Sequence, residues 1–140
     1  WPRPPQRSPN AGDADSRPVF RAMAEGIADG VKGEDRHDGK ADYTGVLMTY
    51  HPRKSAPQSS EWFHADPWLS FNSIQDWPER QVAAVAKDRG LTPPKPTWLL
   101  EGRYEGYWKN KYMAEDWGGW QARQQAYQTA FAGSLGHTYG

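Results

Sequence analysis

Residues 95–105 read Lys95-Pro96-Thr97-Trp98-Leu99-Leu100-Glu101-Gly102-Arg103-Tyr104-Glu105, and the fold assignment starts from this stretch. A proline-containing turn leads into the short apolar run at 97–100, which is typical of a buried strand. Glu101 follows this run directly, and an arginine, a tyrosine and a second glutamate come next. Two interpretations are open: Glu101 is a functional carboxylate at the end of a strand, or it is a surface acid paired with Arg103.

Strands and helices alternate around this run. Hydrophobic periodicity and the Gly/Pro pattern predict helices at 18–28, 78–89 and 120–132, one helical turn at 61–64, and strands at 45–51, 68–75, 97–100 and 135–139. Residues 1–16 are rich in proline and are predicted to be irregular. Strands separated by helices indicate a parallel sheet with crossover connections, so the fold class is α/β.

The predicted helices each have an apolar face. The expected face residues are Val19, Phe20, Met23, Ala24 and Ile27 in the first helix; Val82, Ala83, Val85 and Ala86 in the second; and Ala122, Ala126, Tyr127, Ala130 and Phe131 in the last. The run at 45–51 is apolar on both faces, which is typical of a parallel strand covered on both sides.

Functional side chains concentrate in the loops that follow the strands, whereas the loops that follow the helices are shorter and less polar. This is the arrangement of a TIM barrel, whose sites lie at the carboxyl ends of its strands. A whole barrel takes about 250 residues, and this chain has 140. We therefore predict one domain over 1–140, a partial (β/α)8 TIM barrel that spans roughly strands 4–8.

Composition excludes several classes of function. The 17 basic and 17 acidic residues cancel, which gives no reason to expect a nucleic acid or an anionic membrane as partner. The absence of cysteine excludes disulfides and thiolate chemistry. No apolar run approaches the roughly 20 residues that span a bilayer, and no signal-peptide pattern is found. The 8 Trp and 7 Tyr suit either a groove that stacks sugars or a small core of large side chains.

Each predicted strand end supplies candidate site residues. Glycoside hydrolysis needs two carboxyl groups beside the bond that breaks, and Glu101 is the best-placed catalytic candidate. Arg103 can orient it through a forked hydrogen bond, and Tyr50 or Tyr139 can donate to it. The candidate substrate-binding residues are His51, Arg53, Trp62, His64, Trp68, Asn72, Gln75, Arg103, Tyr104, Glu105, His137 and Tyr139.

The stretch at 59–68 has two interpretations of equal weight. It holds two tryptophans, a histidine and two acids, which suit a substrate-binding lip. It also suits a capped turn in which Trp62 and Trp68 plug the barrel. The four histidines show no spaced pair of the His-x-x-x-His kind, so we expect no metal site, and no phosphate loop or other cofactor motif is present.

Several of these segments together resemble the apiosidase-like glycoside hydrolases, a TIM-barrel family. The resemblance rests on Leu47-Met48-Thr49-Tyr50-His51-Pro52-Arg53, Ser59-Ser60-Glu61-Trp62-Phe63-His64, Pro67-Trp68-Leu69-Ser70-Phe71-Asn72-Ser73-Ile74-Gln75, the stretch at 95–105, and Gly136-His137-Thr138-Tyr139-Gly140. It covers roughly residues 17–140, and several motifs in the same order make it specific.

The resemblance implies a retaining layout, with an acid/base after the fourth strand and a nucleophile after the seventh. The nucleophile falls on Glu101, whereas the acid/base falls on Gln6, which has no proton to give. The implied activity is cleavage of O-glycosidic bonds in a plant-type polysaccharide. The alternatives are a non-catalytic carbohydrate-binding remnant and an inactive fragment that self-associates through its two open sheet edges. The resemblance also implies a secreted or periplasmic protein.

Overall fold

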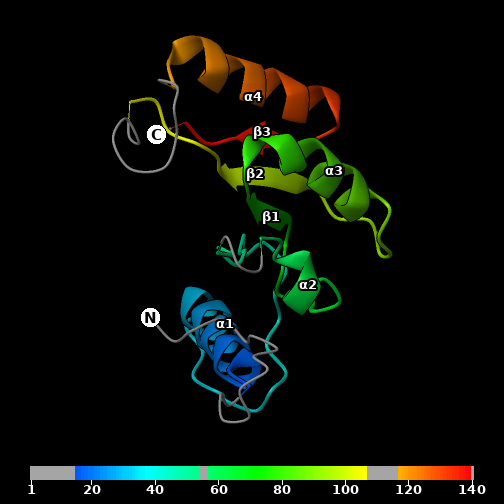
Figure 1. The fold of residues 1–140 in the computed structure, drawn as a ribbon. Helices are drawn as coiled ribbons and strands as arrows, with labels where there is room; N and C mark the ends of the chain where they lie inside the picture. The colour runs from blue at the N-terminus through cyan, green and yellow to red at the C-terminus, as the bar shows by residue number, and fades with distance from the viewer. Residues whose placement is uncertain (1–14, 54–56, 107–116, 140) are drawn as a thin grey trace.

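The computed structural model describes residues 15–53, 57–106 and 117–139. Its centre is a parallel sheet of three strands, β1 (Asn72–Gln75), β2 (Thr97–Glu101) and β3 (Gly136–His137), in that spatial order. Helix α3 (Pro78–Arg89) connects β1 to β2, and helix α4 (Gly119–Phe131) lies between β2 and β3 in sequence (Figure 1). The predicted alternation of parallel strands with helices is confirmed for this part of the chain.

The pairing of β1 with β2 changes register near its carboxyl end. Ile74 pairs with Leu99, but Gln75 pairs with Glu101, so Leu100 is passed over. Side chains alternate between the two faces of a strand, and strict alternation would place Glu101 on the same face as Leu99. An extra residue of this kind re-aims the side chains that follow it. The shift places Glu101 on the opposite face, together with Gln75.

Helices α3 and α4 lie side by side on one face of the sheet (Figure 1). Ile74 and Leu99 point toward them and form a fully buried cluster with Ala84 and Val85 of α3. Burying aliphatic side chains of this size stabilises the fold by roughly 1.5–3 kcal/mol each. This cluster fixes the strands against the helix layer.

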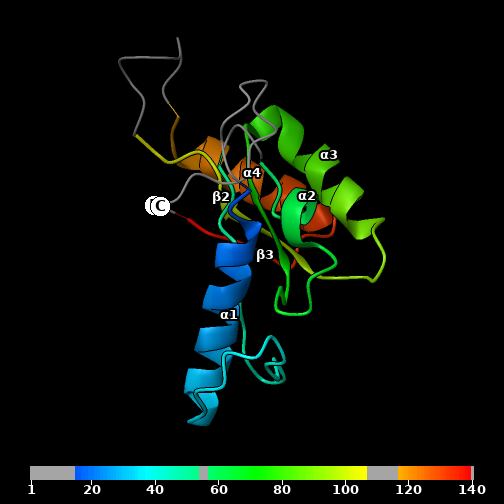
Figure 2. The same ribbon diagram turned by 90° about the horizontal axis from the view of Figure 1, so that it is seen from below.

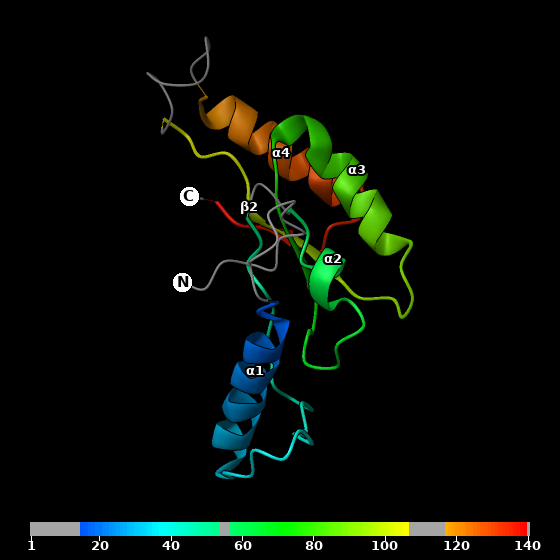
Figure 3. The same cartoon turned by 60° about the horizontal axis from the view of Figure 1, so that its bottom comes forward.

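A second core forms around α1 (Arg17–Lys32) and the short helix α2 (Ser60–Phe63). Phe63 is fully buried, and its ring lies 5.0 Å from the rings of both Tyr50 and Trp68. Phe20 of α1 packs on the same cluster. Helix α1 lies at the end of the molecule opposite α4, and the loop that follows it runs back alongside it (Figures 2 and 3).

The segment at 45–51 is not the regular strand that its composition predicted. Leu47 is 80% exposed, and Gly45, at the start of the segment, lies in a turn with a left-handed φ of 78°. The segment still runs beside the approach to β1, because Ser70 donates its N–H to the carbonyl of Met48 over 2.8 Å. The edge of β1 itself is occupied by residues 57–59, since Gln58 bridges Ile74 in the antiparallel sense.

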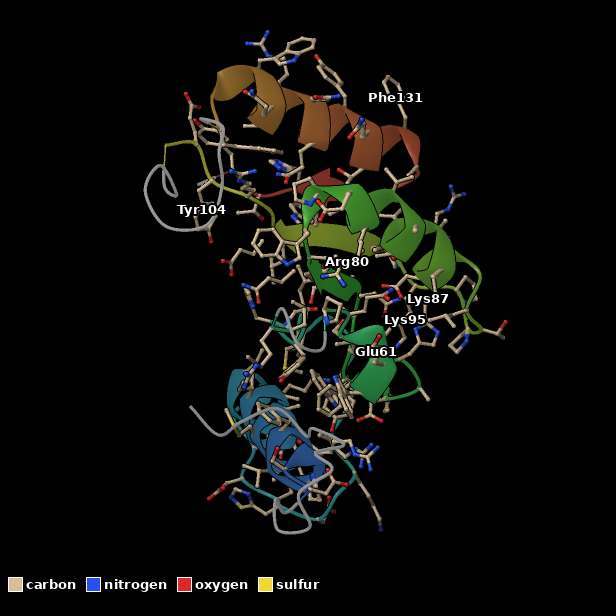
Figure 4. All side chains as sticks on the ribbon, viewed as in Figure 1. Glu61, Arg80, Lys87, Lys95, Tyr104 and Phe131 are labelled. Atoms are coloured by element: carbon tan, nitrogen blue, oxygen red, sulfur yellow. The ribbon has the colours of Figure 1, made fainter. Side chains whose placement is uncertain are left out.

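All three helix faces differ in part from the predicted ones, and in α1 the exposed residues are Val19, Met23 and Ile27. Tyr127 and Phe131 of α4 are 58% and 87% exposed, and Phe131 projects away from the sheet (Figure 4). The residues that α4 buries are Ala122, Gln125 and Thr129, and those that α3 buries are Gln81, Ala84, Val85 and Asp88. Helix α1 also continues past Asp29-Gly30 to Lys32 and ends at Gly33, which has a φ of 72°. Buried amides thus replace part of the apolar face that periodicity predicted.

None of the helices in the described residues is both long and apolar enough to cross a membrane.

Candidate active site

Glu101 is the last residue of β2, at the carboxyl end of the parallel sheet. Its side chain is 24% exposed, and its Oε2 atom lies 3.1 Å from the Nε2 atom of His51. The register shift also brings Gln75 beside it at the end of β1. His51 and Gln75 therefore lie beside Glu101 at the strand ends, on the face of the sheet opposite the helices. Arg53, two residues after His51, is exposed.

Both ring nitrogens of His51 face oxygen acceptors. Its Nδ1 atom lies 2.8 Å from the carbonyl oxygen of Pro52, and its Nε2 atom faces the Glu101 carboxylate. A carbonyl and an ionised carboxylate only accept hydrogen bonds, so both bonds form at once only when the imidazole carries two protons. The ring of His51 therefore connects the Glu101 side chain to the backbone of the segment that carries His51.

Arg103 does not form the predicted forked pair with Glu101. Its guanidinium lies over the ring of Trp117, 4.2 Å from the ring centroid, which is a cation–π arrangement. Its backbone N–H donates over 3.0 Å to the side-chain oxygen of Gln125. Arg103 therefore joins the loop after β2 to Trp117, before α4, and to the middle of α4. Tyr104, the next residue, is half-buried.

Tyr139 and Glu105 form a second polar pair after the strand ends. The Tyr139 hydroxyl donates to Oε2 of Glu105, and this bond raises the pKa of the Tyr139 phenol. Tyr139 is thus engaged with Glu105 rather than with Glu101. Tyr50, the other expected donor, is 8% exposed within the aromatic cluster, and burial raises the pKa of its phenol.

His137 is turned toward the helix layer. It pairs in register with Leu99, whose side chain lies in the cluster beneath α3. Its Nε2 atom lies 3.0 Å from the amide nitrogen of Gln125 in α4. Burial lowers the pKa of the His137 imidazole. His137 therefore lies behind the strand end that carries Glu101.

Four candidate binding residues lie at the opposite end of β1. His64 contacts Asn72, the first residue of β1, over 3.1 Å. Asn72 and Gln75 are separated by about 10 Å along the strand. Trp68 is 5% exposed, donates to Asp66 and packs on Phe63, and Trp62 packs against the same cluster. The structure therefore places the stretch at 59–68 in a core rather than beside Glu101.

The structure adds residues that the sequence did not single out. Trp98 is the register partner of Ser73 and lies on the same face as Gln75 and Glu101, where its ring contacts Phe71. Gln81 and Gln125 are buried polar residues inside helices, at 1% and 2% exposure. The sequence gives only one sign of these amides, which is their spacing. Each glutamine falls at a position of its helix that helical periodicity places among buried residues.

Within residues 15–53, 57–106 and 117–139, no group of three or more His, Asp or Glu side chains has the proximity of a metal site. The expected acid/base position, Gln6, and the irregular segment at 1–14 lie outside the described residues.

Comparison with known proteins identifies the family. The model of the apiosidase-like catalytic domain matches residues 8–140. The chain belongs to the apiosidase-like family. The resemblance inferred from the motifs is thereby confirmed, and no curated protein matches the sequence significantly.

Two solved structures similar to this apiosidase-like chain are described as glycoside hydrolases. One is the crystal structure of a glycoside hydrolase family 5 protein from Bacteroides vulgatus ATCC 8482, with 31% identity, a TM-score of 0.59, and coverage of 69% of this chain and 24% of that one. Another, described as a glycoside hydrolase, has 26% identity, a TM-score of 0.61, and coverage of 92% and 38%. The chain thus spans about a quarter to two fifths of these TIM-barrel proteins, and the predicted partial barrel is confirmed.

Proposed function

We propose that this apiosidase-like chain carries the nucleophile of a glycoside hydrolase, and that the nucleophile is Glu101. The supporting observation is the pairing of Glu101 with His51 at the carboxyl end of a parallel strand, on the face of the sheet away from the helices. Active sites of TIM-barrel enzymes lie at this end of the strands. The contact with His51 orients the Glu101 carboxylate, whose ionised form is the nucleophile.

In the proposed reaction, a Glu101 carboxylate oxygen bonds to the anomeric carbon as the bond from that carbon to the leaving-group oxygen breaks. The leaving oxygen takes a proton from a general acid, and water then hydrolyses the glycosyl ester and releases Glu101. General acid help is typically worth about 10²–10⁴-fold. The family resemblance implies that the acid position falls on Gln6, so natural glycosides with poor leaving groups are the substrates most affected.

Aryl glycosides test the nucleophile separately from the acid, because a nitrophenolate departs without being protonated. We expect the chain to hydrolyse at least one member of a panel of 4-nitrophenyl glycosides, and Glu101→Gln to abolish this activity. Glu79→Gln, the same change at an exposed position in the first turn of α3, is the matched control. Equal rates for wild type and Glu101→Gln would refute the assignment.

The proposed substrate class is a plant-type polysaccharide, which rests on family membership. Trp98 offers a flat ring on the Glu101 face, and its indole N–H donates to Thr138 over 3.0 Å, which holds the ring in place. Aromatic faces of this kind stack on sugar rings. We expect Trp98→Ala to raise KM more than it lowers kcat, and Trp62→Ala to leave KM unchanged because Trp62 lies in the second core.

The second candidate function is carbohydrate binding without turnover, which is favoured if the acid position falls on Gln6, as the resemblance implies. It predicts that oligosaccharides bind, that no glycoside of the panel is hydrolysed, and that Trp98→Ala weakens binding. Isothermal titration with a set of plant oligosaccharides distinguishes the two functions. Turnover of an aryl glycoside that depends on Glu101 would exclude the binding-only alternative.

A further inference from the structure

Two buried amides connect the carboxyl ends of all three strands. Gln81 of α3 donates its Nε2 hydrogens to the carbonyl of Asp76, just after β1, over 2.8 Å and to Oε1 of Gln125 over 2.9 Å. Gln125 of α4 in turn contacts Arg103, just after β2, and His137 in β3. Both amides are almost fully buried, so water does not replace these partners.

The orientation of the Gln125 amide is fixed by its partners. The backbone N–H of Arg103 can only donate, and it lies 3.0 Å from one end of the amide, so that end is the oxygen. Gln81 donates to the same oxygen. The amide nitrogen of Gln125 must therefore face His137, over 3.0 Å. A flipped amide would place two hydrogen-bond donors against its NH2 group.

This orientation determines which nitrogen of His137 carries the proton. The NH2 group of Gln125 donates, so the Nε2 atom of His137 has to accept and carries no hydrogen. Neutral His137 then holds its proton on Nδ1. Protonating Nε2 would bring two donors together, and relieving that clash by turning the amide would break its bonds to Arg103 and Gln81.

We propose that Gln125 is a positioning residue, which holds His137 as the neutral Nδ1–H tautomer and fixes the Glu101-Gly102-Arg103 strand end from behind the sheet. The inference rests on the proposed function, because Glu101 is the group being positioned. Only one residue separates the anchored N–H of Arg103 from Glu101. Nucleophilic attack needs alignment so close that a misplacement of about 1 Å can cost about a hundredfold in rate.

The variant that tests this is Gln125→Glu, which keeps the shape of the side chain and replaces the NH2 group with an acceptor. One carboxylate oxygen can still accept from Arg103 and Gln81, while the other now requires a proton on Nε2 of His137. Gln124→Glu makes the same chemical change at the neighbouring exposed position and is the matched control.

The measurement is the set of ring-nitrogen chemical shifts of His137 in the uniformly ¹⁵N-labelled full chain, assigned by comparison with His137→Phe and followed over pH. We expect wild type and Gln124→Glu to show the Nδ1–H tautomer. In Gln125→Glu we expect a proton on Nε2 and a rise in the pKa of His137 of about 1 to 3 units. An Nε2–H tautomer in wild type would overturn the proposal, whether or not the variant folds. An unchanged tautomer and an unchanged pKa of His137 in folded Gln125→Glu would also overturn it.

Two further measurements separate this inference from the proposed function. Hydrogen exchange at the Arg103 amide should accelerate in Gln125→Leu and stay unchanged in Gln124→Leu, and equal protection in both would refute the anchoring. If the chain hydrolyses aryl glycosides, kcat should fall about tenfold to a hundredfold in Gln125→Glu with a smaller change in KM. Absence of hydrolysis in wild type would refute the proposed function, while the ring-nitrogen shifts and amide exchange still decide the anchoring.

Discussion

The Nε2 atom of His51 lies 3.1 Å from Oε2 of Glu101, although 50 positions separate the two residues in the chain. The partners of His51 are both acceptors, whereas the Nε2 atom of His137 faces a donor. The two histidines near this strand end therefore have different hydrogen-bond partners. His51 faces the Glu101 carboxylate, and His137 lies behind the strand.

His51→Gln removes the imidazole that contacts Glu101 and should lower aryl glycoside hydrolysis about tenfold to a hundredfold, because Glu101 loses its orienting partner. The stability of the fold should change by less than about 1 kcal/mol, since half-exposed ion pairs contribute little. His37→Gln is the matched control, because that histidine pairs with Asp35 while 70% exposed. Activity equal to wild type in His51→Gln would show that the pair does not support the nucleophile.

Gly102→Ala should distort the same strand end. A Cβ at Gly102 would lie 2.2 Å from Nε2 of Gln125, which cannot move without losing its bonds. Overpacking of this kind costs about 1–3 kcal/mol, so thermal melts should show a lower Tm. Gly26→Ala is the control, because no atom lies within 4 Å of its added Cβ and alanine favours the helix by about 1 kcal/mol. A Tm for Gly102→Ala at or above wild type would contradict the close approach.

Much of the secondary structure follows from local sequence. Helix α3 was predicted at 78–89 and is observed at Pro78–Arg89, and the strand predicted at 97–100 extends by one residue to Glu101. Proline at the start of α3 and a short apolar run in β2 are strong local signals. Family membership also followed from motifs that remain in order along the chain.

The direction of side chains did not follow from local sequence. Strict alternation from Leu99 would have turned Glu101 under the helices, and only the register with β1 shows otherwise. Arg103 and His137 were expected beside Glu101, but partners distant in sequence, Trp117 and Gln125, hold them elsewhere. Such partners are chosen by tertiary packing, which the periodicity of one segment does not encode.

Asp88 should make stability depend on pH. Its side chain is fully buried, and burial raises its pKa more than the hydrogen bonds from Ser60 and Gln58 lower it. The native state therefore binds this proton more tightly than the unfolded chain, whose Asp titrates near about 3.9. The contribution of Asp88 to the unfolding free energy is full below that pH and is lost as the pH rises through its raised native pKa.

Asp88→Asn removes the buried charge and keeps an oxygen that can accept from Gln58 and Ser60. The variant should gain in Tm over wild type at pH 7, and the gain should shrink toward pH 4. The control is Asp35→Asn, because the Asp35 side chain is 86% exposed. The Tm of this variant should equal that of wild type at pH 7 and at pH 4. A gain that is equal at both pH values would show that the Asp88 charge is not the cause.

Helix α1 carries an apolar stripe that the described residues leave half-exposed. Val19, Met23 and Ile27 recur every fourth position and are 51%, 48% and 50% exposed. The edge of β3 is a second surface that can pair with another chain, because no described strand pairs with its outer side. We therefore expect concentration-dependent self-association in sedimentation velocity.

The double variant Met23→Lys with Ile27→Lys should weaken this self-association. It should change the stability of the fold by less than about 0.5 kcal/mol, as substitutions at exposed sites do. Leu47→Lys, an isolated exposed residue, should not weaken it. A wild type that stays monomeric at all concentrations would refute this expectation.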